Sequence, residues 1–262
     1  RVSRGLGDVY KRQELSESIG GEAHDEIKSH AFSFKDNLTG KDLSIRPDIS
    51  EQASRIDAYR IQSNEVVKLC YAGEVVKSKA SKSLRSRTTI QVGAEIFGDS
   101  SKDAELESIN LMLKSLEIAG IKNITLSLGH AAFTSSVLEP FKKLGRELFA
   151  DLEIALSKKS KSDLDKIIPD SYENKQSLIS LCDMYGEIDI IQSAKESFSY
   201  LETTQNFMDD LEGLADKLIN KSGLILHIDL GEVQGFKYHN GVVFSAYALS
   251  LIHISEPTRH TR

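Results

Sequence analysis

The sequence predicts an α+β fold in which an antiparallel sheet, flanked by helices, is interrupted by a long helical block. Residues 88–98 (TTIQVGAEIFG) alternate apolar and polar side chains, and strand composition returns in residues 223–230 and 242–248. Between these strands, residues 133–222 have helical spacing and almost no β pattern, which predicts four to six helices. A sheet interrupted by an inserted block of helices accounts for this order.

The stretch 88–98 carries the most informative pattern in the chain. Gln91, Gly93 and Glu95 share one face of the predicted buried strand, and Gly93 leaves space where its neighbours project. Gln91 and Glu95 lie roughly 13 Å apart along an extended strand, so they could hold opposite ends of one small polar molecule. Two simpler interpretations stay open: an edge strand with its polar face in water, or Glu95 paired with an arginine elsewhere.

The remaining elements follow from local patterns. Phe32 and Phe34 predict a strand that turns through 36–40 into a second strand at 43–45, and the apolar spacing after Pro47 predicts a helix at about 49–62. Residues 65–77 predict two short strands around Ala72-Gly73. Residues 99–101 offer helix caps before an amphipathic helix that ends near Gly120, and residues 122–128 form another strand.

Residues 78–87 form a loop rich in serine and basic side chains between two strands. Such a loop could hold phosphate, although a solvated hairpin tip is the commoner structure for a run of charge. His130, which follows the strand at 122–128, is expected to be a hydrogen-bonded structural histidine. The five cations of this loop and its N-terminal edge are Lys77, Lys79, Lys82, Arg85 and Arg87.

Composition narrows the class of protein. No apolar run is long enough for a transmembrane helix, no signal peptide is readable, and Cys70 and Cys182 are isolated, which favours a reducing cytoplasm and no metal site. No phosphate-loop, dinucleotide, zinc-protease or hydrolase motif occurs.

Both ends resemble translated sequencing adaptors. Residues 1–13 and 250–262 are therefore expected to be foreign, leaving one domain at 14–249 that is truncated at both ends. Residues 14–249 carry 27 Lys and Arg against 37 Asp and Glu, a net charge of −10. This acidity argues against a nucleic-acid surface.

Three stretches together resemble the core of class II histidyl-tRNA synthetases. They are RPDISEQASR (46–55), CYAGEVV…RSRTTIQVGAEIFG (70–98) and HIDLGEVQGFKYHNGVVFSAY (227–247). The resemblance implies a class II synthetase-like sheet that cradles histidine. It implies that Asp48 holds the amino group of histidine, and that Gln91 and Glu95 serve its backbone and imidazole. It further implies that Tyr238 and His239 supply ring side chains.

Three positions depart from the synthetase pattern. An Arg-x-Glu pair that handles ATP in synthetases is replaced by Lys77 and Lys79, and a second arginine is replaced by Gln234. Lysine cannot make the planar bidentate phosphate contact of arginine, and losing one preorganised charged donor costs about 10²–10³ in rate. Arg85 and Arg87 are retained, so some anion affinity is expected. Catalytic residues and a cofactor are not expected.

A pocket that keeps its amino-acid contacts and loses its ATP contacts resembles the regulatory subunits of ATP phosphoribosyltransferase. That resemblance implies a cytoplasmic, non-catalytic protein that joins the short-form catalytic subunit, binds L-histidine as an effector and dimerises at full length. It implies a role in the first step of histidine biosynthesis and in its feedback inhibition. The alternatives are an active histidyl-tRNA synthetase and a synthetase-like binding module for another partner.

Overall fold

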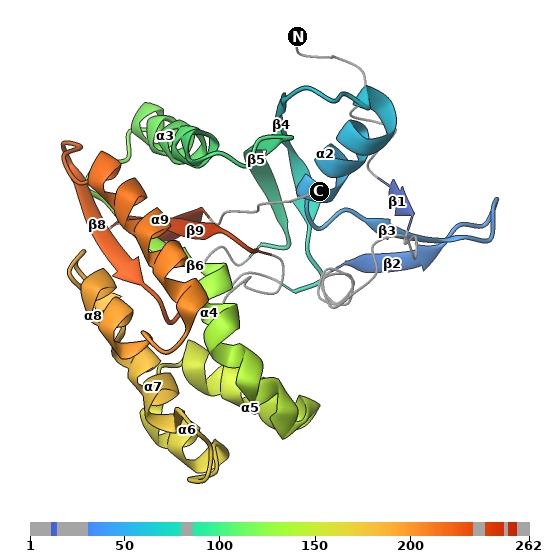
Figure 1. Ribbon diagram of the computed structural model, residues 1–262. Coiled ribbons are helices and arrows are strands. Elements are labelled where there is room, and N and C mark those ends of the chain that lie inside the picture. The colour runs from blue at the N-terminus through green and yellow to red at the C-terminus, as the bar shows by residue number, and fades with distance from the viewer. Residues whose placement is uncertain (1–11, 15–30, 80–85, 233–238, 249–250, 256–262) are drawn as a thin grey trace. The chain divides into compact units, whose positions relative to one another are not determined.

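The computed structural model describes residues 12–14, 31–79, 86–232, 239–248 and 251–255, the first and last of these as backbone only. The chain divides between Ser100 and Ser101 into two compact units, which are described separately below. Figure 1 labels the elements of both. Within the described ranges, no helix has the length and apolar character needed to cross a bilayer. Nor do His, Cys, Asp and Glu side chains there form a cluster suited to a metal ion.

In its described residues, the first unit contains two small antiparallel sheets and one α-helix. The predicted hairpin at 32–45 is confirmed: Phe32 pairs with Ile45, and Asp36 caps the turn by accepting from the Thr39 hydroxyl at 2.6 Å. The predicted helix at 49–62 is α2 followed by a π-helical turn. The strands and helices are β1 (Arg12–Glu14), β2 (Phe32–Lys35), β3 (Asp42–Ile45), α2 (Ser50–Ile56), the π-turn (Asp57–Ile61), β4 (Val67–Val76) and β5 (Thr88–Phe97).

The prediction of two short strands in 65–77 is wrong, because β4 is one continuous strand of ten residues. Gly73 does not turn the chain; it pairs with Gln91 inside the β4–β5 ladder. The guanidinium of Arg46 lies across this glycine, and a Cβ added at Gly73 would meet Arg46 Nη2 at 2.6 Å. The same side chain donates from Nε to the Glu74 carbonyl at 2.8 Å. Gly73 therefore serves a close side-chain approach rather than a turn.

Strand β5 alternates as predicted, but its polar face is the more buried one. Glu95 is 6% exposed, whereas Ile90 and Val92 on the opposite face are each 75% exposed. The inversion arises because α2 and the segment before it pack on the Gln91–Glu95 face, where Gln91 bonds to Ile49. The expectation that this strand is buried is therefore wrong for the face that carries Ile90 and Val92.

The second unit is built on a five-stranded sheet in the order β10-β9-β6-β8-β7. Three of its pairings are antiparallel, as predicted, but β6 and β8 run parallel. Parallel neighbours need a long crossover, and the whole helical block supplies it. The strands are β6 (Ile124–His130), β7 (Tyr185–Gly186), β8 (Leu224–Asp229), β9 (Val242–Ala248) and β10 (Leu251–Ser255).

Helices of the second unit follow the predicted positions. Helix α3 begins after Ser101, whose hydroxyl accepts from the Ala104 amide at 3.2 Å, and Gly120 has a φ of 80° just past its end. Six α-helices lie between β6 and β8, within the described range 86–232. The helices are α3 (Lys102–Ile118), α4 (Ala131–Leu138), α5 (Arg146–Ser157), α6 (Lys161–Ile167), α7 (Lys175–Ser180), α8 (Ile190–Ser197) and α9 (Glu202–Leu218), with 3₁₀ turns at Glu139–Leu144 and Leu181–Asp183.

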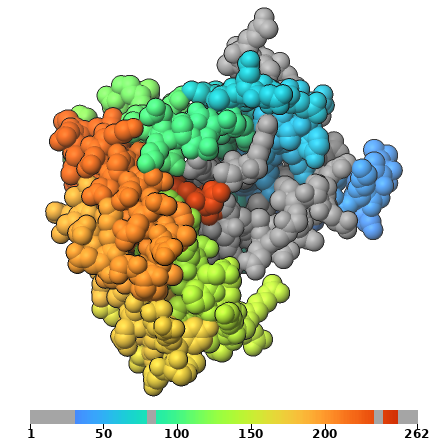
Figure 2. Space-filling model, viewed as in Figure 1, coloured from blue at the N-terminus to red at the C-terminus, as the bar shows by residue number. Residues whose placement is uncertain are grey.

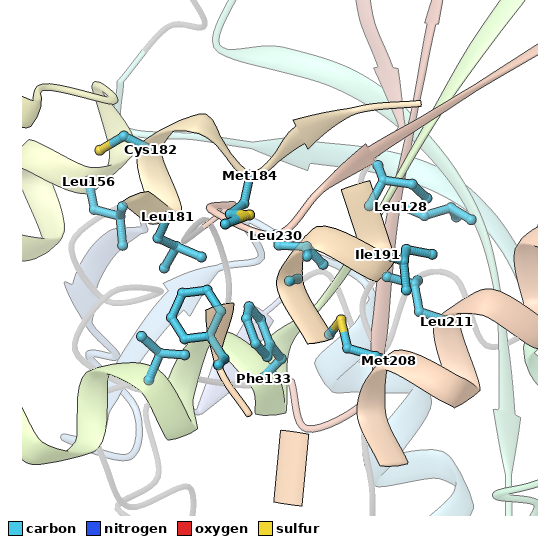
Figure 3. Packing of buried hydrophobic residues seen from close by; sticks show 14 of the residues in the cluster. Leu128, Phe133, Leu156, Leu181, Cys182, Met184, Ile191, Met208, Leu211 and Leu230 are labelled. Carbon is cyan, nitrogen blue, oxygen red and sulfur yellow. The ribbon is translucent and has the colours of Figure 1, made fainter. Parts of the chain in front are cut away.

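The core of the second unit lies between the helical block and the central strands. Phe133 of α4 is fully buried and meets Phe198 edge to face, with ring centroids 5.2 Å apart. Figure 3 shows Phe133 near Met208 and Leu230, so helices and strand ends share one cluster. In the space-filling view of Figure 2, this block forms a continuous surface from green-yellow α5 to orange α9. Burial of this cluster is the main stabilising contribution in the unit.

Candidate functional site

The candidate site lies in the first unit, where the start of α2 meets the polar face of the β4–β5 hairpin. Asp48 precedes the helix, and Gln91 and Glu95 project from β5. The Gln91 carbonyl accepts from the Ile49 amide at 2.9 Å, and the Gln91 amino group donates to Asp48 Oδ1 at 3.2 Å. The structure therefore brings together the three residues predicted to hold the polar parts of a ligand.

The orientation of the Gln91 amide is fixed by its partners. The backbone amide of Ile49 can only donate, so it must face the carbonyl oxygen of Gln91, and the amino group faces Asp48. One of the two amino hydrogens is used on Asp48, and the second has no partner among the described residues. Asp48 Oδ1 also accepts from the Ser50 amide at 2.7 Å, and Asp48 Oδ2 takes part in neither bond. The second amino hydrogen of Gln91 and the Oδ2 atom of Asp48 therefore form a neighbouring donor and acceptor.

Glu95 lies deeper in the hairpin face and makes hydrogen bonds to hydroxyl groups. The Tyr71 hydroxyl donates to Glu95 Oε1 at 3.2 Å, and Ser50 lies within reach of both. Burial raises the pKa of Glu95 from 4.5 to about 7; the hydroxyls of Ser50 and Tyr71 oppose this rise, and the charge of Asp48 adds to it. Among the described residues Glu95 has no ion pair, and it is buried. Glu95 is therefore not in water, and no arginine of the described residues pairs with it.

Tyr71 is the member of the site that the sequence pattern missed. It pairs with Gly93 across the hairpin, and its ring lies over that glycine. A Cβ added at Gly93 would meet the Tyr71 ring atoms at 2.3–2.7 Å. Gly93 therefore leaves room on the backbone as the sequence indicated, and the ring of Tyr71 occupies it. The available signal was the hairpin register: in a hairpin centred on residue 82, Tyr71 and Gly93 face each other across the two strands.

The close approach of Tyr71 predicts the result of substituting Gly93. Gly93→Ala is expected to lower the free energy of unfolding by about 1–3 kcal/mol, because the ring must move to admit a methyl group. The same substitution in a Tyr71→Ala background should cost clearly less. Urea denaturation of the four proteins in this cycle measures the coupling. Additive effects of the two substitutions would contradict the packing described here.

The structure does not show the remaining predicted residues in contact with Asp48, Gln91 or Glu95. Lys77 and Lys79 are exposed, and the Lys77 amide donates to the Arg87 carbonyl at 2.8 Å to close the hairpin. The Arg87 guanidinium carbon lies 5.8 Å from the centroid of the Phe32 ring. Arg85, Gln234 and Tyr238 lie outside the described residues.

His130 and His239 both belong to the second unit. His239 precedes β9 and is half-buried, and its grouping with the site in the first unit remains a prediction. His130 ends β6, is 4% exposed and stacks on Phe207 at 4.8 Å between ring centroids. This packing agrees with the structural role expected for His130.

Solved structures with a similar backbone fold identify the fold class. The crystal structure of an ATP phosphoribosyltransferase regulatory subunit/histidyl-tRNA synthetase from Bacillus halodurans matches with a TM-score of 0.73 at 22% identity, over 92% of this chain and 63% of that one. The ATP phosphoribosyl transferase (HisG:HisZ) complex from Thermotoga maritima matches with a TM-score of 0.62 at 18% identity, over 84% of this chain and 76% of that one. The fold is that of the class II aminoacyl-tRNA synthetases, as the sequence predicted.

The sequence comparison is more specific. A family model described as histidyl-tRNA synthetase matches residues 12–253, and the chain belongs to this family. A curated relative from Cupriavidus metallidurans, named ATP phosphoribosyltransferase regulatory subunit, is 32% identical over 240 residues, which are 90% of this chain and 61% of the relative. The chain spans about three fifths of the length of such relatives.

Proposed function

We propose that this chain is part of the regulatory, non-catalytic subunit of an ATP phosphoribosyltransferase. In this role it joins a short-form catalytic subunit in the cytoplasm, and phosphoribosyl-ATP forms on that partner in the first step of histidine biosynthesis. L-histidine bound to this chain mediates feedback inhibition. The names of the curated relatives support the assignment of the family role, and the site supports the ligand.

The observation that carries the ligand is the hydrogen-bonded pair of Asp48 and Gln91, with Glu95 close enough to feel the charge of Asp48. Histidine offers an ammonium, a carboxylate and an imidazole, and the site offers a matching group for each. Asp48 accepts from the ammonium, the second Gln91 amino hydrogen meets the carboxylate, and Glu95 accepts from a ring N–H. Tyr238 and His239 complete the ring contact in this proposal.

The mechanism is thermodynamic linkage between this site and the complex. Histidine favours one arrangement of the subunits over another by its differential affinity, and coupling free energies of this kind are typically about 1–3 kcal/mol. The chain itself does not activate histidine with ATP. Its exposed Lys77 and Lys79 replace the arginine and glutamate that handle ATP in synthetases. Arg85 and Arg87 give at most a general anion affinity.

Copurification tests the assigned partner. The full-length protein containing this sequence, co-expressed with a short-form phosphoribosyltransferase, should elute with it as one hetero-oligomer and raise its synthesis of phosphoribosyl-ATP. Separate elution of the two proteins, with no change in activity, would contradict the proposal. Self-association of the full-length protein is measured in the same experiment by light scattering.

An active histidyl-tRNA synthetase is the second candidate, and the description of the matching family favours it. Histidine-dependent exchange of pyrophosphate into ATP separates the two candidates. We expect no exchange above background, because the positions that grip ATP have changed. Exchange at an ordinary synthetase rate would establish the second candidate and remove the first.

A further inference from the structure

The hydroxyl of Tyr71 joins two elements of the candidate site. It lies 2.9 Å from Ser50 Oγ at the start of α2 and 3.2 Å from Glu95 Oε1 on β5. A tyrosine has one hydroxyl proton, and here it is donated to the carboxylate; the Ser50 hydroxyl, which also reaches Glu95, donates its one proton either to Tyr71 or to Glu95. The result is a hydrogen-bonded cluster in which the hydroxyls of Ser50 and Tyr71 both hold the Glu95 carboxylate.

Packing alone does not account for this hydroxyl. The ring of Tyr71 covers Gly93, and a phenylalanine ring would cover it equally well. The hydroxyl group instead lies in a largely desolvated place, where burial raises its pKa far above the usual range. A hydroxyl kept there, hydrogen-bonded on both sides, orients the groups that it contacts.

We propose that Tyr71 is a positioning residue for ligand recognition: together with Ser50 it holds the Glu95 carboxylate as an oriented acceptor for one ring N–H of the ligand. This inference rests on the proposed histidine site and adds a specificity-determining residue to it. A site with one oriented acceptor favours a side chain that presents a single ring N–H at the right place. The ligand class is therefore an amino acid with an azole ring.

The groups that face Glu95 decide how Tyr71 affects its ionisation. Ser50 and Tyr71 face it with hydroxyls, Asp48 faces it with a negative charge, and Leu69 pairs with it across the hairpin. The Tyr71 hydrogen bond lowers the pKa of Glu95, so removing it moves that pKa above about 7. More Glu95 is then protonated at pH 7, and a protonated carboxyl is a poorer acceptor. Binding by such a variant should recover as the pH rises.

Tyr71→Phe tests the proposal in the full-length protein. Calorimetric titration with L-histidine at pH 7 should give a Kd about three- to tenfold weaker than that of the intact protein, the loss of one hydrogen bond. The difference should narrow above pH 8. Tyr59→Phe is the matched control, because Tyr59 is 68% exposed on the same unit, and it should leave the Kd unchanged. Ser50→Ala should weaken binding in the same direction and with the same pH dependence.

The outcomes separate this inference from the proposed function. An unchanged Kd, or an equal loss at every pH, in Tyr71→Phe would overturn the role of Tyr71 while leaving the histidine site in place. Absence of histidine binding by the intact protein and by its complex would overturn both. The carboxyl titration of Glu95, followed by ¹³C NMR without ligand, gives an independent measurement. Its midpoint should rise in Tyr71→Phe, and an unshifted midpoint would overturn the inference.

Discussion

Glu95→Gln is expected to weaken histidine binding by about 10²-fold while making the unliganded protein more stable at pH 8. The loss of affinity follows because a carboxylate that accepts a ring N–H makes a charge-assisted hydrogen bond, which contributes about 1.5–3 kcal/mol. An amide of the same shape retains a carbonyl for the Tyr71 hydroxyl but carries no charge. Calorimetry of the full-length variant measures the loss.

The gain in stability follows from the pKa of Glu95. Its pKa is about 7 in the folded protein and 4.5 when unperturbed, so the folded state holds a proton that the unfolded state releases. Stability is therefore greatest below about pH 4.5 for this group and falls as the pH rises through about 7, by up to about 3 kcal/mol. Glutamine does not titrate, so its contribution to stability does not change with pH. The free energy of unfolding of the variant should therefore be higher than that of the intact protein at pH 8, and this difference should disappear near pH 5.

Urea denaturation at pH 5 and pH 8 measures this difference. Glu65→Gln is the matched control, because Glu65 is exposed on the same unit, and it should change stability little at either pH. A Glu95→Gln protein that binds histidine normally, or that is less stable than the intact protein at pH 8, would contradict the description of the site.

Phe133→Ala is expected to lower the free energy of unfolding by about 3–5 kcal/mol, a large fraction of the stability of a typical domain. Phe133 is fully buried in α4 and meets Phe198 edge to face. Its removal leaves a cavity between the helical block and the strands, and the surrounding side chains can fill it only in part. Leu148→Ala on α5 is the control; Leu148 is 44% exposed and should cost less than about 1 kcal/mol. Equal losses for the two variants, measured by urea denaturation, would contradict the assigned core.

The sequence predicted those features that depend on local patterns. Ser101 and Gly120 bound α3 because capping chemistry is local, and Gln91 and Glu95 share a face because strand side chains alternate. The prediction that Asp48 lies near Gln91 and Glu95 came from the family resemblance, since no sequence periodicity connects residues in different elements. Hydrogen bonds join Asp48 to Gln91, and Glu95 lies near enough to feel the charge of Asp48; their role as a histidine site stays a prediction.

The missed features depend on contacts between distant residues. Gly73 and Gly93 suggested a turn and an open space, whereas Arg46 and Tyr71 lie across them. Nothing local to a glycine says which side chain approaches it. The parallel pairing of β6 with β8 was missed for the same reason, because 93 residues of crossover separate the end of one strand from the start of the other. The sequence shows that the crossover is helical, but it does not show in which direction the following strand runs.

The central claim, that histidine acts through this site on a catalytic partner, is tested most directly by inhibition of the reconstituted complex. Synthesis of phosphoribosyl-ATP would be followed against L-histidine for complexes containing the intact subunit or Glu95→Gln. We predict that both complexes are active without histidine, that the intact complex is inhibited, and that the variant requires about 10²-fold more histidine for the same inhibition. Equal inhibition of the two complexes would contradict the claim.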